Sequence, residues 1–253
     1  MVADAVVLAG GSCKGLSEAP AKGLVEINGK PMVEYVLEAL VACADIGRIC
    51  VVVPPGICGP WTEKADIVVE SDGSLTRNFA NGVAGLKTYR KVIVLSSDIP
   101  LLTPEAIGDF LKRCAEEPAR LYYPIIPEEA ARRLFPEMKR TYVKMKEGSF
   151  TGGNIALVDP SLVDSHAGLM EEAYAMRKSP FKLAKRLGFA FVVRALFGAL
   201  SIASAEKRVG EMLESPVKAV ITPFPEIGID VDKPSDLEIV RKHLAGDSFG
   251  VAN

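Results

Sequence analysis

The segment AVVLAGG, residues 5–11, decides the fold class. Five small or aliphatic residues in a row are typical of a strand buried on both faces of a parallel sheet, because such strands lack the polar alternation of half-exposed ones. Gly10 and Gly11 then end the strand and let backbone N–H groups approach a ligand closely. Since open α/β sheets bind ligands at the carboxyl ends of their strands, we expect a binding crevice at this loop.

Apolar strands and amphipathic helices alternate through the first half of the chain. The further strands expected there cover residues 48–53, 66–69 and 91–95, and the helices cover residues 32–44, 74–89 and 104–115. Such alternation indicates βαβ units, a parallel sheet and helices on both faces. The sequence therefore predicts an α/β protein with a single-domain, three-layer αβα, Rossmann-like fold around a mostly parallel central sheet.

The second half of the chain has a different pattern. We expect a strand at 121–126, a hairpin over 139–158 that turns at Glu147-Gly148, a mainly helical stretch at 160–210, short strands at 217–222 and 226–229, and a last helix at 234–244. The prediction is one domain over 1–246 and a flexible tail over 247–253. Within the domain, 139–225 is expected to be an elaborated region for acceptor binding or dimerisation, and a homodimer is one possible assembly.

Composition narrows the class of partner and the compartment. The net charge of −2 gives no bulk electrostatic case for binding nucleic acid or anionic lipid. Five cysteines without a C-x-x-C pair, and an amino terminus without a signal peptide, predict a cytoplasmic protein. The most apolar stretch, residues 188–205, contains Arg194 and is expected to be a buried helix or partner interface, with no stable membrane insertion.

The glycine loop is followed by basic residues. Lys14 and Lys22 place positive charge in the same loop, which suits the phosphates of a nucleotide. Neither G-x-x-x-x-G-K-[ST] nor G-x-G-x-x-G is present, so the loop is not a P-loop or a dinucleotide fingerprint. The alternative is a simple turn with a solvated lysine.

The longer string LAGG-x10-KGLVEINGKPM, residues 8–32, resembles the start of nucleotidyltransferases with a GT-A-like fold. The resemblance is greatest to the MobA-like, molybdenum-cofactor group and lower to isoprenoid cytidylyltransferases and sugar-1-phosphate nucleotidyltransferases. It implies Mg²⁺-dependent transfer of a nucleotide from an NTP to a phosphorylated small molecule, with release of pyrophosphate. It also implies that Lys22 is catalytic. The residues it implies at the nucleotide are Leu8, Ala9, Gly10, Gly11 and Lys14, the last where relatives usually carry an arginine.

Three aspartates are the expected metal ligands. Asp98 follows the strand at 91–95, and its segment DIPLL resembles the family's D-x-P-L/Y-L motif, which implies a metal ligand there. Asp230 and Asp232 lie two apart on an extended chain and therefore face the same side. One of them would join Asp98 on Mg²⁺, a hard cation that takes oxygen ligands. We place Asp230 first, because Asp232 is also placed to cap the last helix.

Two further segments are candidates through the resemblance. Gly73 and Arg77 precede and begin a predicted helix, where relatives bind the base and the phosphates; the alternative for Arg77 is a solvated helix start. Gly152, Gly153 and Asn154 correspond to an element that lines the acceptor pocket in similar enzymes, and the alternative is a glycine bulge in a strand.

Two other function classes compete with nucleotidyl transfer. A GT-A glycosyltransferase would use a nucleotide-sugar and normally carries D-x-D, whereas this position reads Ser96-Ser97-Asp98. A non-catalytic nucleotide-binding protein is the second alternative. The chain has only two histidines, which suits nucleotidyl transfer, because an acceptor phosphate is already ionised near neutral pH and needs no general base.

Overall fold

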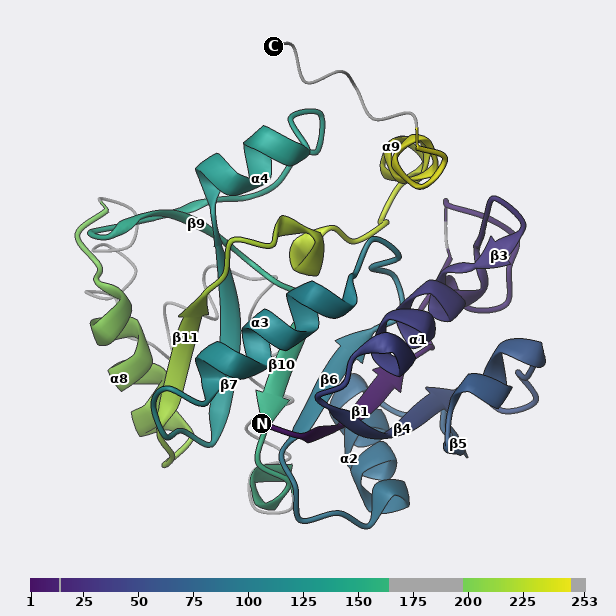
Figure 1. Cartoon of the computed structure of the whole chain (residues 1–253), viewed down its shortest axis with the longest axis horizontal. Helices are drawn as coiled ribbons and strands as arrows, with labels where there is room; N and C mark the ends of the chain where they lie inside the picture. The colour runs from purple at the N-terminus through teal and green to yellow at the C-terminus, as the bar shows by residue number, and fades with distance from the viewer. Residues whose placement is uncertain (14, 164–197, 247–253) are drawn as a thin grey trace.

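A nine-stranded sheet runs through the described part of the chain, in the order β5-β4-β1-β6-β10-β7-β9-β8, with β11 paired to β7. The computed structural model describes residues 1–13, 15–163 and 198–246. Four strands form the parallel half in Figure 1: β1 (Ala3–Leu8), β4 (Ile46–Val53), β5 (Ile67–Glu70) and β6 (Val92–Ser96). The prediction of a mostly parallel central sheet in an α/β fold is confirmed.

The other half of the sheet mixes directions. Its strands are β7 (Leu121–Pro127), β8 (Val143–Met145), β9 (Gly148–Gly152), β10 (Ile155–Val158) and β11 (Val217–Ile221). β10 lies between β6 and β7 and is antiparallel to both, whereas β11 is parallel to β7. β7 therefore runs in the same direction as β6, and the sheet continues across both halves.

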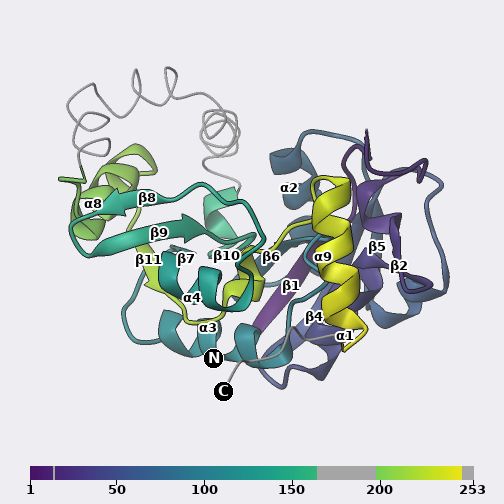
Figure 2. The same cartoon turned by 90° about the horizontal axis from the view of Figure 1, so that it is seen from above.

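Helices cover both faces of the sheet, as Figure 2 shows. α1 (Met32–Ala42) and α3 (Pro104–Cys114) lie on one face, and α2 (Leu75–Leu86) lies on the other. Ala5 and Val7 of β1 pack in the core with α1 and α3, while Val6 packs in the core with Phe79 of α2. Successive side chains of a strand point to opposite faces of the sheet. Because both faces of β1 are covered, its sequence is a continuous apolar run.

The last helix packs beside the amino-terminal loop. α9 (Pro234–Leu244) packs Leu237 and Val240 in one core cluster with Val25 of the amino-terminal loop and Met32 at the start of α1. The loop itself is shaped by η1 (Lys22–Leu24) and a small hairpin of β2 (Glu26–Ile27) and β3 (Lys30–Pro31). Packing of α9 therefore places the segment before it beside residues that are two hundred positions earlier in the sequence.

Several expectations for the second half are wrong. The 139–158 segment is not one hairpin: β8 and β9 pair with each other, but β10 leaves them and enters the sheet beside β6. Residues 226–229 form no strand, because η3 (Pro225–Gly228) is a 3-10 turn. A helix over Glu128–Leu134, α4, was not expected. The errors in the strands share one cause, since short apolar runs do not show which segment will pair with them.

η2 (Pro60–Lys64) follows β4 and was not expected. α8 (Ile202–Met212) lies within the stretch that was expected to be helical. Most of the apolar stretch at 188–205 and all of the tail at 247–253 lie outside the described residues. Among the helices that are described, none has the length and apolar character needed to span a membrane.

Candidate active site

The glycine loop leaves β1 and is held to the turn that carries Lys22. Gly11 has a φ of +98°, which favours glycine, and its carbonyl accepts the Lys22 N–H at 3.1 Å. Gly23 packs against the end of β6, where a Cβ would lie 2.5 Å from Ser97 Oγ. The absence of a side chain at Gly23 therefore lets the turn approach β6 and brings Lys22 to Asp98.

Lys22 joins two of the three expected metal ligands. Its ammonium group donates to Asp98 Oδ2 at 2.5 Å and also pairs with Asp232 Oδ1. The side chains of Lys22 and Asp98 are mostly buried, whereas Asp232 is exposed. Burial alone would lower the pKa of Lys22, but the two carboxylates outweigh it and raise that pKa above the ordinary lysine value. Lys22 is therefore a cation at neutral pH.

Asp230 has a different partner. Arg140, from the loop between α4 and β8, donates through Nη1 to Asp230 Oδ1 at 2.7 Å. The Asp230–Asp232 segment is aligned with β6 because Val231 N–H donates to the Asp98 carbonyl at 3.0 Å. Asp232 is not the cap of α9: Lys233 holds that position, and Asp236 accepts from the N–H groups of Asp232 and Lys233. The capping alternative for Asp232 is therefore wrong.

The three carboxylates fit a hard divalent cation. Asp98, Asp230 and Asp232 each offer one oxygen, and these oxygens lie within 4.8 Å of one another. Oxygens bound to one Mg²⁺ at about 2.1 Å lie at most about 4.2 Å apart, so small side-chain movements would bring all three within reach. Asp98 Oδ1 is buried without a hydrogen-bond partner, so its lone pairs are available to coordinate a cation. The three carboxylates carry three negative charges, and Lys22 and Arg140 carry two positive charges. The group therefore has a net charge of −1, which favours binding of a cation.

The expected acceptor element lies beside this group. Gly152 ends β9, and Asn154 N–H donates to the Ile227 carbonyl at 2.9 Å, while the Asn154 carbonyl accepts from Ser96 N–H at 3.3 Å. A Cβ on Gly153 would lie 2.8 Å from both Pro124 Cγ and Ile227 Cγ2. The glycines let the chain cross tightly from β9 to β10, and this crossing places Asn154 next to the carboxyl end of β6.

Two other candidates lie elsewhere. Gly73 and Arg77 follow β5, which is three strands away from β6, or about 14 Å at ordinary strand spacing. Arg77 is exposed, and its N–H donates to the Ser74 hydroxyl that caps α2. The structure therefore does not bring this pair to the aspartates. Lys14 lies outside the described residues.

Arg140 is a site residue that the sequence did not indicate. It stands next to Lys139 in a loop with no motif, and no periodic pattern marks it. Its role comes from a contact across 90 positions, to Asp230, which no local signal shows.

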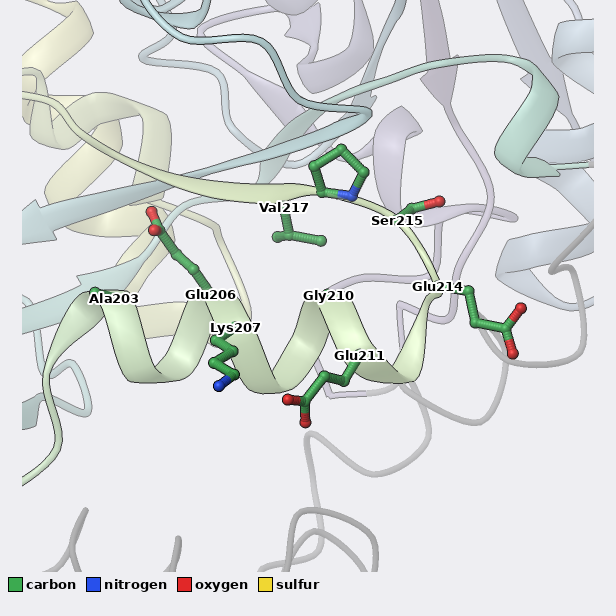
Figure 3. Close-up of a pocket in the computed structure, with 9 residues that line it drawn as sticks. Ala203, Glu206, Lys207, Gly210, Glu211, Glu214, Ser215 and Val217 are labelled. Atoms are coloured by element: carbon green, nitrogen blue, oxygen red, sulfur yellow. The ribbon is translucent and has the colours of Figure 1, made fainter.

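A separate pocket of 540 Å³ lies between α8 and β11, away from these residues (Figure 3). It is lined by Glu206, Glu211 and Glu214 together with Lys207, so acidic groups predominate. A polyanionic nucleotide would be repelled there, and we do not assign the nucleotide to this pocket.

Comparison with known proteins identifies the family. A family model described as the MobA-like NTP transferase domain matches residues 5–218. The chain belongs to this family of nucleotidyltransferases. The resemblance inferred from the glycine loop is thereby confirmed.

Solved structures show the same fold. This family member is 38% identical to a hypothetical transferase from Thermus thermophilus, with a TM-score of 0.83 over 94% of this chain and 100% of that one. A 2-C-methyl-D-erythritol 4-phosphate cytidylyltransferase, also from Thermus thermophilus, is 16% identical, with a TM-score of 0.57 over 97% and 100% of the two chains. At that identity the likeness concerns the fold alone.

A curated relative matches over a short segment. The chain is 45% identical over 49 residues to a 2-C-methyl-D-erythritol 4-phosphate cytidylyltransferase from Clostridium perfringens. This match spans 19% of the chain and about a fifth, 22%, of the relative's length.

Proposed function

We propose that this chain transfers a nucleoside monophosphate from a Mg²⁺-bound NTP to a phosphorylated small-molecule acceptor and releases pyrophosphate. The observation that carries the proposal is the group formed by Lys22, Asp98, Asp230 and Asp232 beside the Gly10-Gly11 loop. Membership of a nucleotidyltransferase family supports it, as does the similarity of a 49-residue segment to a cytidylyltransferase.

The glycine loop, Lys22 and the three aspartates have different roles in the proposed reaction. The loop of Leu8 to Gly11 offers backbone N–H groups to the nucleotide, and Lys22 exchanges a carboxylate for an NTP phosphate when the substrate binds. Asp98, Asp230 and Asp232 would hold Mg²⁺, which when bound supplies charge neutralisation at the α-phosphate. The chain's own contribution is then to position two phosphates in line and to keep charge balanced around them.

The chemical step needs no base from the protein. An oxygen of the acceptor phosphate forms a bond to the α-phosphorus, and the bond from that phosphorus to the oxygen bridging to the β-phosphate breaks. The electron pair leaves with pyrophosphate. Phosphate monoesters are largely dianionic near neutral pH, so no proton has to be removed. No histidine lies among the described residues of the site, and this mechanism requires none.

A coupled assay tests the proposal. Thermal shifts with each NTP and Mg²⁺ identify the nucleotide, with CTP tested first because the curated relative is a cytidylyltransferase. Pyrophosphate release is then measured against a panel of phosphorylated small molecules. We expect release that depends on both the acceptor and Mg²⁺. Turnover of nucleotide-sugars without pyrophosphate would support the glycosyltransferase instead, and nucleotide binding without turnover across the panel would support the non-catalytic alternative.

A further inference from the structure

Four buried side-chain polar atoms in the described part of the chain have no hydrogen-bond partner: Ser96 Oγ, Asp98 Oδ1, Arg140 Nε and Asn154 Nδ2. All four belong to residues in or beside the candidate active site. Folded proteins keep few such atoms, because an unpaired buried polar group costs free energy. Their concentration in one place indicates groups that are kept for a ligand.

Two of these atoms are hydrogen-bond donors only. Arg140 Nε and Asn154 Nδ2 carry N–H groups and have no lone pair to offer. Both residues lie around the crossing from β9 to β10: Asn154 is part of it, and Arg140 Nη2 donates to the Gly152 carbonyl. The group that completes them must accept hydrogen bonds, and next to a guanidinium it is most stable as an anion.

One edge of the Arg140 guanidinium makes few hydrogen bonds. The side chain is only 14% exposed, and Nη1 is fixed by Asp230 at 2.7 Å. The contact from Nη2 to Gly152 is long, at 3.5 Å, and Nε has no partner. Nε and Nη2 form the fork that pairs with two oxygens of one phosphate or carboxylate. Asp230 thus orients the guanidinium, and the fork remains for an incoming group.

We propose that Arg140 binds the phosphate of the acceptor through this fork, with the Asn154 amide as a further donor. This inference rests on the proposed nucleotidyl transfer and identifies the acceptor side of that site. Because Arg140 contacts Asp230, an anion on its fork lies beside the three aspartates, where the attacking phosphate is needed.

The test measures binding of inorganic phosphate by calorimetry. The full chain is first saturated with Mg²⁺ and a non-hydrolysable analogue of the NTP that gives the largest thermal shift, so that the nucleotide's own phosphate positions are filled. Wild type is compared with Arg140→Gln and Arg140→Lys. The matched control is Arg132→Gln, since Arg132 lies nearby on α4 but is exposed and paired with Glu128.

We expect Arg140→Gln to weaken phosphate binding by about tenfold or more, and Arg140→Lys to weaken it by about fivefold, because lysine keeps the charge and loses the fork. Arg132→Gln should stay within about twofold of wild type. Phosphate affinity unchanged in folded Arg140→Gln, or no phosphate binding by wild type, would overturn the proposal. If Arg140→Gln does not fold because Asp230 loses its partner, Arg140→Lys decides by the same criterion.

Two further readouts separate the possible failures. Nucleotide affinity is measured in each protein: loss of phosphate binding with nucleotide binding intact supports the acceptor role, whereas no nucleotide binding by wild type overturns the proposed function itself. Acetate is titrated in parallel, and acetate binding as strong as phosphate binding would overturn the assignment to a phosphate. Once an acceptor is found, Arg140→Lys should raise the KM for the acceptor and leave the KM for the NTP unchanged.

Discussion

The two halves of the sheet meet at the candidate active site and build it in different ways. On the parallel side, Gly10-Gly11 and Asp98 directly follow β1 and β6, so the strand ends fix their positions. On the mixed side, Asn154 depends on contacts with Ile227 and Ser96, and Arg140 depends on Asp230. The glycine loop and Asp98 are therefore placed by the strands that they follow, whereas Asn154 and Arg140 are placed by contacts with distant segments.

The largest expected effect removes the central carboxylate of the parallel side. Asp98→Asn keeps the shape of the side chain but loses the charge that pairs with Lys22 and would hold the metal. We expect at least a ~10³-fold loss of acceptor-dependent pyrophosphate release, with a normal melting temperature. Asp109→Asn, on the surface of α3 and paired with Arg113, is the control. If Asp98→Asn keeps activity within tenfold of wild type, Asp98 is not a residue of the active site.

Lys22→Met tests the cation on the same side. We expect a ~10²-fold loss of rate, because one phosphate contact disappears. The nucleotide-free variant should nevertheless bind Mg²⁺ several-fold more tightly, since Asp98 and Asp232 lose the ammonium group that competes for them. Calorimetry with MgCl₂ measures this change. Lys30→Met, in the same loop but paired with Glu38, should change neither quantity; weaker Mg²⁺ binding in Lys22→Met would contradict the idea of competition.

A glycine pair tests how tightly the parallel half is packed. A Cβ on Gly82 of α2 would lie 2.6 Å from Val6 Cγ1, whereas a Cβ on Gly108 of α3 meets its nearest atom at 4.0 Å. We expect Gly82→Ala to destabilise the protein by about 1–3 kcal/mol through overpacking. Gly108→Ala should stabilise it by about 0.5–1 kcal/mol through helix propensity. Urea unfolding measures both, and equal effects would mean that α2 does not lie so close to β1.

The smallest effect concerns a half-buried carboxyl group on the mixed side. Burial raises the pKa of Glu226, whose Oε1 accepts from the Thr103 hydroxyl at 3.1 Å. The folded protein therefore holds this proton more tightly than the unfolded chain, and the contribution of Glu226 to stability falls as pH rises above about 4.5. Glu226→Gln should gain up to about 1 kcal/mol at pH 7, and the gain should vanish below about pH 4. Thermal melts across this range measure it; a gain independent of pH would assign the effect to packing.

The contrast between the halves also explains what the sequence could predict. The segment at 5–11 is buried on both faces, so its composition alone indicates a central parallel strand, and Asp98 is found because it follows another such strand. β10 has only four residues, and its place between β6 and β7 depends on pairing with both. A short apolar run carries no information about those partners.

The same reasoning applies to the site residues. The sequence indicated Lys22, Asp98, Asp230 and Asp232 as candidates. In the structure the three aspartates have carboxylate oxygens within 4.8 Å of one another, and Lys22 pairs with Asp98 and Asp232. Their roles stay predictions. Arg140 was missed because its partner is 90 residues away, and Arg77 was included only through the resemblance. Electrostatic contacts between loops depend on the whole fold, and no local spacing encodes them.

The position of β10 has a consequence for the order in which the chain can fold. During synthesis, β1, β4, β5 and β6 can pair as soon as the first hundred residues have emerged, but β6 then has an open edge. That edge is filled only by residues 155–158, and the pair Asp230 and Asp232 arrives later still. The nascent chain therefore passes through a stage at which the glycine loop has formed while one edge of β6 is unpaired, and an unpaired strand edge is a site where chains can aggregate.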